Sequence, residues 1–227
     1  MDPMAQKTKL PLAVAAYQRI YEKIIKLDYQ PGQGLEEKRL MEELHLGRTP
    51  IREALLRLAG EKMVLSQPGK GFIVRPITFQ NIKSTFEMLK LLETGVAELM
   101  VRYDLRPFIE GMEEAHEAVR EAIEKKDVLG MVEANHRFHK HYAGCSHNEY
   151  LIDAVEEVRS EAKRMSYLSY SGDLGVGGTL TDHHQSVDRD HRGIIQLVKE
   201  KKVEKLKEIV LTHIHAFQKR IVFFMSA

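Results

Sequence analysis

Residues 31–74 read PGQGLEEKRLMEELHLGRTPIREALLRLAGEKMVLSQPGKGFIV, and this stretch decides the fold of the N-terminal part of the chain. Its first segment, Glu36–Leu44, places leucines four residues apart and predicts a short helix with one apolar face. Residues 45–47 are too few and too turn-like for anything but a corner. A second helix should follow at once, because Thr49 is a suitable N-cap and Pro50 loses no hydrogen bond at a first helical position.

The second helix carries two arginines at its beginning. Arg48 and Arg52 are four residues apart and share one face, while the apolar residues turn to another. Guanidinium groups in this position reach guanine edges or phosphates in a major groove. Two helices joined by a short corner therefore predict a helix-turn-helix reader of DNA. The apolar positions are Ile51, Ala54, Leu55 and Leu58.

A β-hairpin is predicted directly after this helix. Met63–Gln67 and Gly71–Val74 can pair across the turn at residues 68–70. The turn places Lys70 and Gly71 at a tip that can approach a phosphate backbone or a minor groove. The same pattern also fits a generic helical hairpin with solvated arginines and an ordinary Pro-Gly turn. The corner, the arginine pair and the hairpin occur together and in order, which favours a winged helix-turn-helix.

The stretch resembles the winged-helix signature of the GntR family of bacterial transcription regulators. The matching residues are Pro31-Gly32, Leu35, Arg48-Thr49-Pro50-Ile51-Arg52-Glu53-Ala54-Leu55 and Gly71. Gly47 departs from the signature, since the family usually has a serine there. The resemblance implies a double-stranded DNA operator, contacted by the helix-turn-helix and by the wing tip. The implied DNA-binding residues are Lys38, Arg48, Thr49, Arg52, Lys70 and Gly71.

Charge is distributed unevenly about Pro76. Residues 1–76 contain 13 Lys and Arg against 9 Asp and Glu, and the remainder contains 21 against 24. A basic head on a mildly acidic body fits a nucleic-acid-binding domain, although a solvated helical surface can produce the same modest excess. Within the head, Val14–Leu27 has apolar residues at helical spacing and is expected to support the DNA-binding helices.

The composition is that of a globular chain of one or two domains. The 227 residues are 43% hydrophobic, which is enough for a buried core. Cys145 is the single cysteine, so no disulfide can form within the chain. No apolar run reaches membrane-spanning length and no signal peptide is recognised, which predicts a cytoplasmic protein without a membrane partner.

After Pro76 the sequence predicts only helices. Alternating strand patterns do not occur, and six segments with helical periodicity are typical of a bundle. Asp127, Asn148 and Ser186 are the expected N-caps of the third, fourth and fifth helices. The glycine-rich residues 172–178 are interpreted as a connector, because no Lys-Ser or Lys-Thr follows their glycines. The predicted helices are Asn81–Tyr103, Pro107–Lys125, Val128–Ser146, Glu149–Tyr170, Val187–Lys201 and Val203–Met225.

Three histidines of these helices are expected to point inward. At about 100° per residue, His213 lies in line with the apolar residues of the last helix, and His215 is turned about 200° away. His139 and His191 lie on the inward faces of their own helices. Three imidazoles from three helices could converge on one metal ion. A lone inward histidine is more often a hydrogen-bonded core residue, so that alternative stays open.

The helical part resembles the FCD ligand-binding domain of the FadR subfamily. The resemblance is carried by Asn135-x-x-Phe138-His139, Asp190-His191-x-x-Ile194 and His213-Ile214. In that domain an Asp and three His commonly hold zinc, nickel or manganese. The implied metal ligands here are Asn135, His139, His191 and His213. Asn135 replaces the usual Asp, and a neutral amide is a weaker donor than a carboxylate.

A second departure from the FCD pattern concerns the effector. Leu89 stands where the family usually has an arginine that meets a carboxylate of the effector. The candidates to replace this arginine are Lys90, Arg159 and Arg164.

The sequence therefore predicts a mainly α protein with a winged helix-turn-helix domain (residues 10–76) and an all-helical effector-binding, metal-binding and dimerisation domain (residues 77–227). We expect a homodimeric regulator whose binding to an inverted-repeat operator is modulated by a small molecule. Helix Asn81–Tyr103 is expected to supply interface material. One alternative is a metal-dependent hydrolase, for which no inward Asp or Glu presents itself as general base. The other is a metal sensor without an organic effector.

Overall fold

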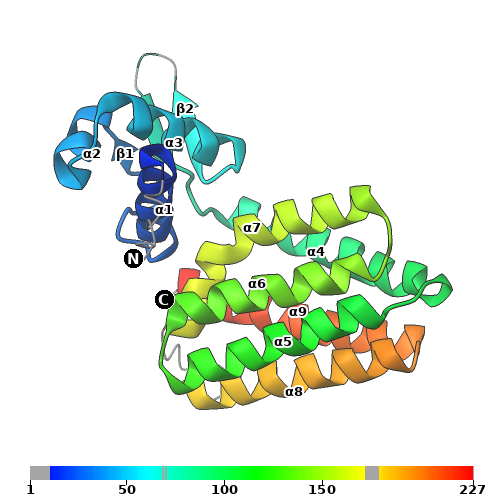
Figure 1. Cartoon of the computed structure of the whole chain (residues 1–227). Coiled ribbons are helices and arrows are strands. Elements are labelled where there is room, and N and C mark those ends of the chain that lie inside the picture. The colour runs from blue at the N-terminus through cyan, green and yellow to red at the C-terminus, as the bar shows by residue number, and fades with distance from the viewer. Residues whose placement is uncertain (1–10, 68, 70, 172–178, 227) are drawn as a thin grey trace, which may run out of the picture. The chain divides into compact units, whose positions relative to one another are not determined.

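The computed structural model describes residues 11–67, 69, 71–171 and 179–226 (Figure 1). Contacts divide the chain into two compact units, Met1–Pro76 and Ile77–Ala227. The predicted position of Lys70 at the hairpin tip and the predicted connector at residues 172–178 lie outside the described residues. Among the helices that are described, none is long and apolar enough to cross a membrane.

The first unit consists of three helices and a small antiparallel sheet. β2 and β3 form the predicted hairpin, and β1 pairs with the other edge of β3. The predicted winged helix-turn-helix is therefore confirmed. β1 was not predicted, because a two-residue strand leaves no periodicity to recognise. The elements are α1 (Leu12–Ile25), β1 (Gly34–Leu35), α2 (Glu37–Leu44), α3 (Arg48–Gly60), β2 (Val64–Gln67) and β3 (Gly71–Val74).

The core of the first unit fixes the orientation of α3. Ile20 and Ile24 of α1 are fully buried, as are Ile51 and Leu55 of α3 and Val74 of β3. Burial of this apolar face stabilises the unit, at roughly 1.5–3 kcal/mol for each large aliphatic side chain. Because this face packs inward, the arginines at the beginning of α3 remain exposed.

The beginning of α3 differs from the prediction. Gly47 is the N-cap, with extended backbone and no side-chain hydrogen bond, and the helix begins at Arg48. Thr49 and Pro50 therefore lie inside the first turn, and the prediction that Thr49 caps the helix was wrong. The N–H groups of the whole first turn have no intrahelical partner, so Pro50 is tolerated there and does not mark the first helical residue.

The second unit is a helical bundle. α5 packs against α6 and α8, and α4 packs against α7 and α9 (Figure 1). Phe86, Phe138 and Tyr142 are among the fully buried side chains of its core. The helices are α4 (Phe79–Leu99), with a 3-10 turn at Met100–Arg102, α5 (Arg106–Glu124), α6 (Val128–Gly144), α7 (Glu149–Ser171), α8 (Leu180–Lys199) and α9 (Val203–Ser226).

Two of the three predicted helix caps in this unit are confirmed. Asp127 accepts a hydrogen bond from the backbone of Gly130, and Asn148 accepts one from Leu151. α8 begins two turns earlier than predicted, with Thr179 as N-cap in a capping box with Asp182. Ser186 is therefore not a cap. The early turns of α8 are largely polar, so their apolar periodicity was too weak to show the start of the helix.

Candidate functional site

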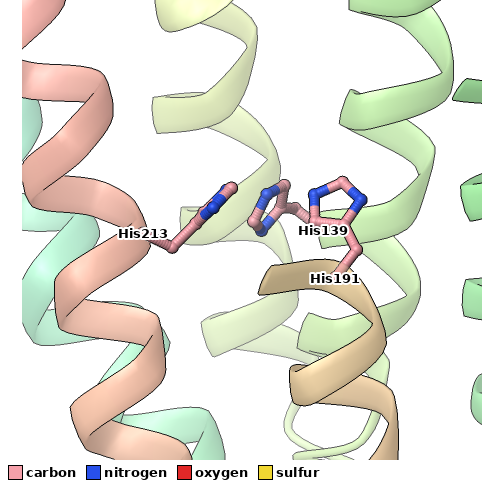
Figure 2. A group of neighbouring side chains, drawn as sticks. All are labelled: His139, His191 and His213. Carbon is pink, nitrogen blue, oxygen red and sulfur yellow. The ribbon is translucent and has the colours of Figure 1, made fainter. Parts of the chain in front are cut away.

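Three histidines meet inside the helical bundle (Figure 2). His139 of α6, His191 of α8 and His213 of α9 each offer one ring nitrogen, and these nitrogens lie within 4.8 Å of one another. The ring centroids are 5.3 to 5.7 Å apart, and all three side chains are buried. His215 is exposed. The structure thus brings together the three imidazoles that the sequence placed on inward faces.

Several ring nitrogens of this cluster have no hydrogen-bond partner among the described residues. They are Nε2 of His139 and both nitrogens of His191. Buried polar atoms are normally hydrogen-bonded, so this concentration of unsatisfied nitrogens fits a site built for a further ligand. Phe138 stacks on His191 with a centroid distance of 3.8 Å and holds that ring in place. Three buried imidazoles are a donor set that suits a divalent transition metal.

Two carboxylates contact the cluster. Oε2 of Glu93 lies 3.3 Å from Nδ1 of His139, and Oδ2 of Asp190 lies 3.2 Å from Nδ1 of His213. The Asp190 carboxylate is hydrogen-bonded to Nδ1 of His213, which orients this ring and leaves its other nitrogen to bind metal. Nδ1 of His139 instead accepts a hydrogen bond from Nη2 of Arg159 at 2.9 Å, so Glu93 contacts this ring without a hydrogen bond. Glu93 and Asp190 are thus inward carboxylates, and the sequence analysis did not place either of them beside the histidines.

Glu93 is the functional residue that the sequence analysis missed. It is fully buried in α4, and Nε of Arg159 donates a hydrogen bond to its Oε1 at 2.6 Å. Burial by itself raises the pKa of Glu93, but the charge and the hydrogen bond of Arg159 act against burial, and the pKa is lowered to about 2. The signal in the sequence was an acidic residue with the apolar Leu89 and Ala97 four positions on either side. A carboxylate with so low a pKa is a weak general base at neutral pH.

Burial keeps two imidazoles of the cluster, His139 and His191, uncharged. Desolvation and the Arg159 guanidinium lower the pKa of His139 to about 3, although Glu93 acts in the opposite direction. Burial also lowers the pKa of His191 well below its usual range. Neutral imidazole is the form that binds a metal ion. Near pH 7 these two rings are therefore ready to bind metal without losing a proton.

A small polar cavity of about 20 Å³ adjoins the cluster. Its lining includes Asn135, Arg159, Asp190 and His213. The side-chain oxygen of Asn135 is buried and has no hydrogen-bond partner in the described part of the chain. A cavity of this size holds about one water molecule or one small polar group. Asn135, with its unsatisfied oxygen, therefore lines the same cavity as His213.

The three cations considered for effector contact lie in different places. Arg159 lines the small cavity and forms an ion pair with Glu93. Nζ of Lys90 donates a hydrogen bond to Gln218 at 2.8 Å. Lys90 and the buried Arg164 are not part of the cavity lining. Of these three residues, Arg159 is the one that adjoins the cavity, and Leu89 is fully buried in the core.

The described residues that the sequence analysis predicted to contact DNA lie on α2, on α3 and at the start of β3. Lys38 on α2 is exposed, as are Arg48, Thr49 and Arg52 in the first turns of α3. Gly71 begins β3 with a φ of 82°, a backbone conformation that favours glycine.

A carboxylate of α2 contacts both arginines of α3. Oε2 of Glu37 lies 2.9 Å from Nε of Arg48, and Oε1 lies 3.7 Å from Nη1 of Arg52. The sequence analysis did not identify this contact, because it depends on how the corner at residues 45–47 sets α2 against α3. Glu37 thus holds two guanidinium groups near each other on the exposed side of α3.

A winged helix-turn-helix joined to a helical bundle with a polar, histidine-lined interior defines a DNA-binding transcription regulator. The profile of the bacterial regulatory proteins of the gntR family matches residues 12–74, and the FCD domain profile matches residues 84–216. The chain belongs to the GntR family of transcription regulators and carries an FCD domain. This family consists of regulators and not of enzymes, so the hydrolase alternative was wrong.

Individual relatives agree with this assignment. The chain is 24% identical to the HTH-type transcriptional regulator YdhC of Bacillus subtilis over 217 residues, which cover 94% of this chain and 92% of YdhC. It is 24% identical to the HTH-type transcriptional repressor RspR of Escherichia coli over 172 residues, which cover 74% of this chain and 75% of RspR. The solved structure of E. coli McbR/YncC has the same fold, with a TM-score of 0.69 and 17% identity over 96% of this chain and 99% of McbR.

Proposed function

We propose that the chain is a homodimeric repressor whose affinity for an inverted-repeat operator is modulated by a small molecule bound beside a divalent metal ion. The observation that carries this proposal is the cluster of His139, His191 and His213, three buried imidazoles from three helices with nitrogens within 4.8 Å. Burying several polar atoms without hydrogen-bond partners destabilises a fold, so such a cluster is best explained by a ligand that satisfies them.

The residues of the cluster fit zinc, nickel or manganese. The three imidazoles would supply nitrogen donors, and the amide oxygen of Asn135 would supply a further donor from the adjoining cavity. Arg159 and Asp190, through hydrogen bonds to the Nδ1 atoms, hold the rings of His139 and His213 in orientation. When bound, the ion supplies a concentrated positive charge that attracts an oxygen-bearing effector.

The effector in this proposal is small and carries oxygen atoms. Leu89 is apolar and buried, so it cannot meet a carboxylate. Arg159 is the cationic candidate that lines the cavity, and its charge is already shared with Glu93. An effector would therefore draw most of its electrostatic attraction from the ion, with Arg159 as a hydrogen-bond donor at the edge of the site.

Operator recognition is assigned to the first unit, through Lys38, Arg48, Thr49, Arg52, Lys70 and Gly71. One winged head covers a half-site, so a two-fold dimer reading an inverted repeat is the arrangement that gives adequate affinity. Exposed apolar side chains on α4, including Leu91 (68% exposed) and Met88 (41% exposed), support this helix as interface material. The naming of RspR as a repressor supports the same sign of regulation here. A regulator of this kind acts in the cytoplasm, where its operator is.

The test begins with the full-length protein purified without chelator. Its metal content is measured, and an operator is selected from a pool of random duplexes. Operator binding of the metal-loaded and metal-stripped protein is then followed by fluorescence anisotropy, with and without compounds that stabilise the loaded protein in a thermal-shift screen. We expect bound metal, an enriched inverted repeat, and a compound that changes operator affinity only when metal is present.

Two results would overturn parts of this proposal. Failure to enrich any sequence would contradict operator recognition. A response of operator affinity to metal alone, with no stabilising compound in the screen, would identify a metal sensor without an organic effector. The variant His215→Ala is the matched control, because this histidine is exposed on the same helix as His213.

A further inference from the structure

A second and much larger cavity lies in the helical bundle. Its volume is about 710 Å³, and its walls come from α5, α6, the end of α7 and the beginning of α8. Small-molecule sites usually measure roughly 300–1,000 Å³. Tyr170 of α7 lines both this cavity and the 20 Å³ cavity beside the histidine cluster. The two cavities are therefore neighbours with different linings, and we call the larger one the α5–α8 cavity.

The α5–α8 cavity combines an apolar lining with charges that cancel. Ile123, Val128, Met131, Tyr170 and Leu180 supply the apolar surface, and Met131 and Tyr170 are buried. Among the described residues, four charged side chains also line the cavity, namely the cations Arg120 and Lys126 and the anions Glu124 and Asp188. Asp188 is already engaged by Arg192 and lies near Arg120. A lining without net charge favours an uncharged occupant over an ion.

His184 adds a hydrogen-bonding group to the lining. Its Nε2 is buried and has no hydrogen-bond partner in the part of the chain that the structure describes. One nitrogen of a neutral imidazole donates a hydrogen bond and the other accepts one. Burial lowers the pKa of His184, which favours this neutral form.

We propose that the α5–α8 cavity is a second small-molecule site, which takes an uncharged, largely apolar molecule with one hydroxyl or N–H group that donates to Nε2 of His184. This site goes beyond the metal-linked function proposed above and does not depend on it. Its occupant differs in chemistry from the oxygen-bearing effector expected at the histidine cluster.

The probe that tests this site is N-phenyl-1-naphthylamine, a neutral fluorophore with an apolar body and one N–H group. Its sulfonated analogue, 8-anilinonaphthalene-1-sulfonate, has the same rings and a negative charge. Both are titrated into metal-stripped, full-length protein, and fluorescence is recorded. We expect saturable binding of one neutral probe per chain, and at least about tenfold weaker binding of the sulfonate. No saturable binding of the neutral probe, or equal binding of the two probes, would overturn the proposal.

Variants locate the bound probe. Gln185→Trp and Ile123→Trp place large rings at two lining positions and should each weaken binding at least about fivefold, and His184→Leu should weaken it at least about threefold. Gln196→Trp is the matched control, because Gln196 is exposed on the same helix and does not line the cavity. Circular dichroism checks that each variant is folded. Unchanged binding in both lining variants would place the probe elsewhere and contradict the assignment.

A last variant separates this site from the metal-linked function. His213→Ala removes one imidazole of the histidine cluster, and His213 does not line the α5–α8 cavity. It should retain full binding of the neutral probe. If this variant lost the probe, the probe would occupy the cavity beside the histidine cluster and the second site would be refuted, while the metal proposal would stand.

Discussion

Oε2 of Glu37 lies 2.9 Å from Nε of Arg48, and the two residues belong to neighbouring helices of the winged head. The arginine side chain is 69% exposed, and an ion pair this exposed contributes at most about 1 kcal/mol. A pair so weak can open when DNA arrives. We therefore propose that Glu37 positions Arg48 in the DNA-free protein and releases it to a base edge or a phosphate when DNA binds.

Replacement of Glu37 should separate affinity from sequence discrimination. Glu37→Gln removes a negative charge from the DNA-facing side and frees Arg48 and Arg52, so binding to random duplex should become roughly 2–5-fold tighter. The affinity for the selected operator should rise less, because the carboxylate of Glu37 no longer positions the two arginines. Glu36→Gln is the control, since Glu36 is an exposed neighbour with the same charge. Equal gains on operator and random duplex in the Glu37 variant would contradict a positioning role.

Arg52 should contribute to base readout. Arg52→Ala is expected to weaken binding to the operator by about 1–3 kcal/mol. Binding to random duplex should weaken much less, because guanidinium contacts to guanine carry sequence information. Fluorescence anisotropy titrations at one fixed salt concentration measure the affinity for the operator and the affinity for random duplex. Arg57→Ala serves as the control, since Arg57 lies in the last turn of α3 and pairs with Glu61. The assignment fails if Arg52→Ala lowers both affinities by the same factor.

The sequence predicted the elements with strong periodicity and missed contacts between elements. The six helices after Pro76 follow from apolar residues at intervals of three and four, and this spacing also placed His139, His191 and His213 on inward faces. The inward face of a helix follows from the residue spacing within that helix alone. Whether Glu93 of α4 reaches His139 of α6 depends on how two helices pack, and no local pattern contains that information.

Helix starts were predicted less well for a related reason. The positions of Thr49 and Ser186 are compatible with an N-cap, but Gly47 and Thr179 hold that position. Several residues near a helix start can satisfy the same cap, and packing of the following turns decides among them. The two cavities could not be predicted at all, because their walls come from residues up to about eighty positions apart.

The stability of the metal-free protein should fall below about pH 6.5. The pKa values of His139 and His183 are lowered to about 3, mainly by burial, so between pH 6.5 and 3 the unfolded chain binds protons that the folded chain does not. Each such histidine costs up to about 1.4 kcal/mol of unfolding free energy per pH unit across this window. Urea unfolding of stripped protein at several pH values measures the slope.

Variants assign that slope to the buried histidines. His139→Gln cannot bind a proton and should reduce the dependence of unfolding free energy on pH, whatever its effect on stability at pH 7. His215→Gln, at an exposed position, should leave the dependence unchanged. An identical slope in the wild type and the His139 variant would show that this imidazole is not buried as the structure has it.

Metal binding should depend on the three histidines, on Asp190 and on Asn135. His213→Ala removes a nitrogen donor and should abolish stoichiometric metal. Asp190→Asn keeps every proposed ligand but weakens the contact at 3.2 Å that orients His213, which should cost about 10–100-fold in metal affinity. Asn135→Asp should bind metal more tightly than the wild type, because a carboxylate is a stronger donor than an amide and compensates the ion's charge.

Elemental analysis and competition with a chromogenic chelator measure these affinities on the full chain. Asp188→Asn is the control for Asp190→Asn, because Asp188 lies on the same helix and pairs with Arg192. Full metal occupancy in His213→Ala, or an unchanged affinity in Asp190→Asn, would mean that these residues do not hold or orient an ion. The cluster would then be a set of core histidines, and regulation by small molecules would have to act through the α5–α8 cavity.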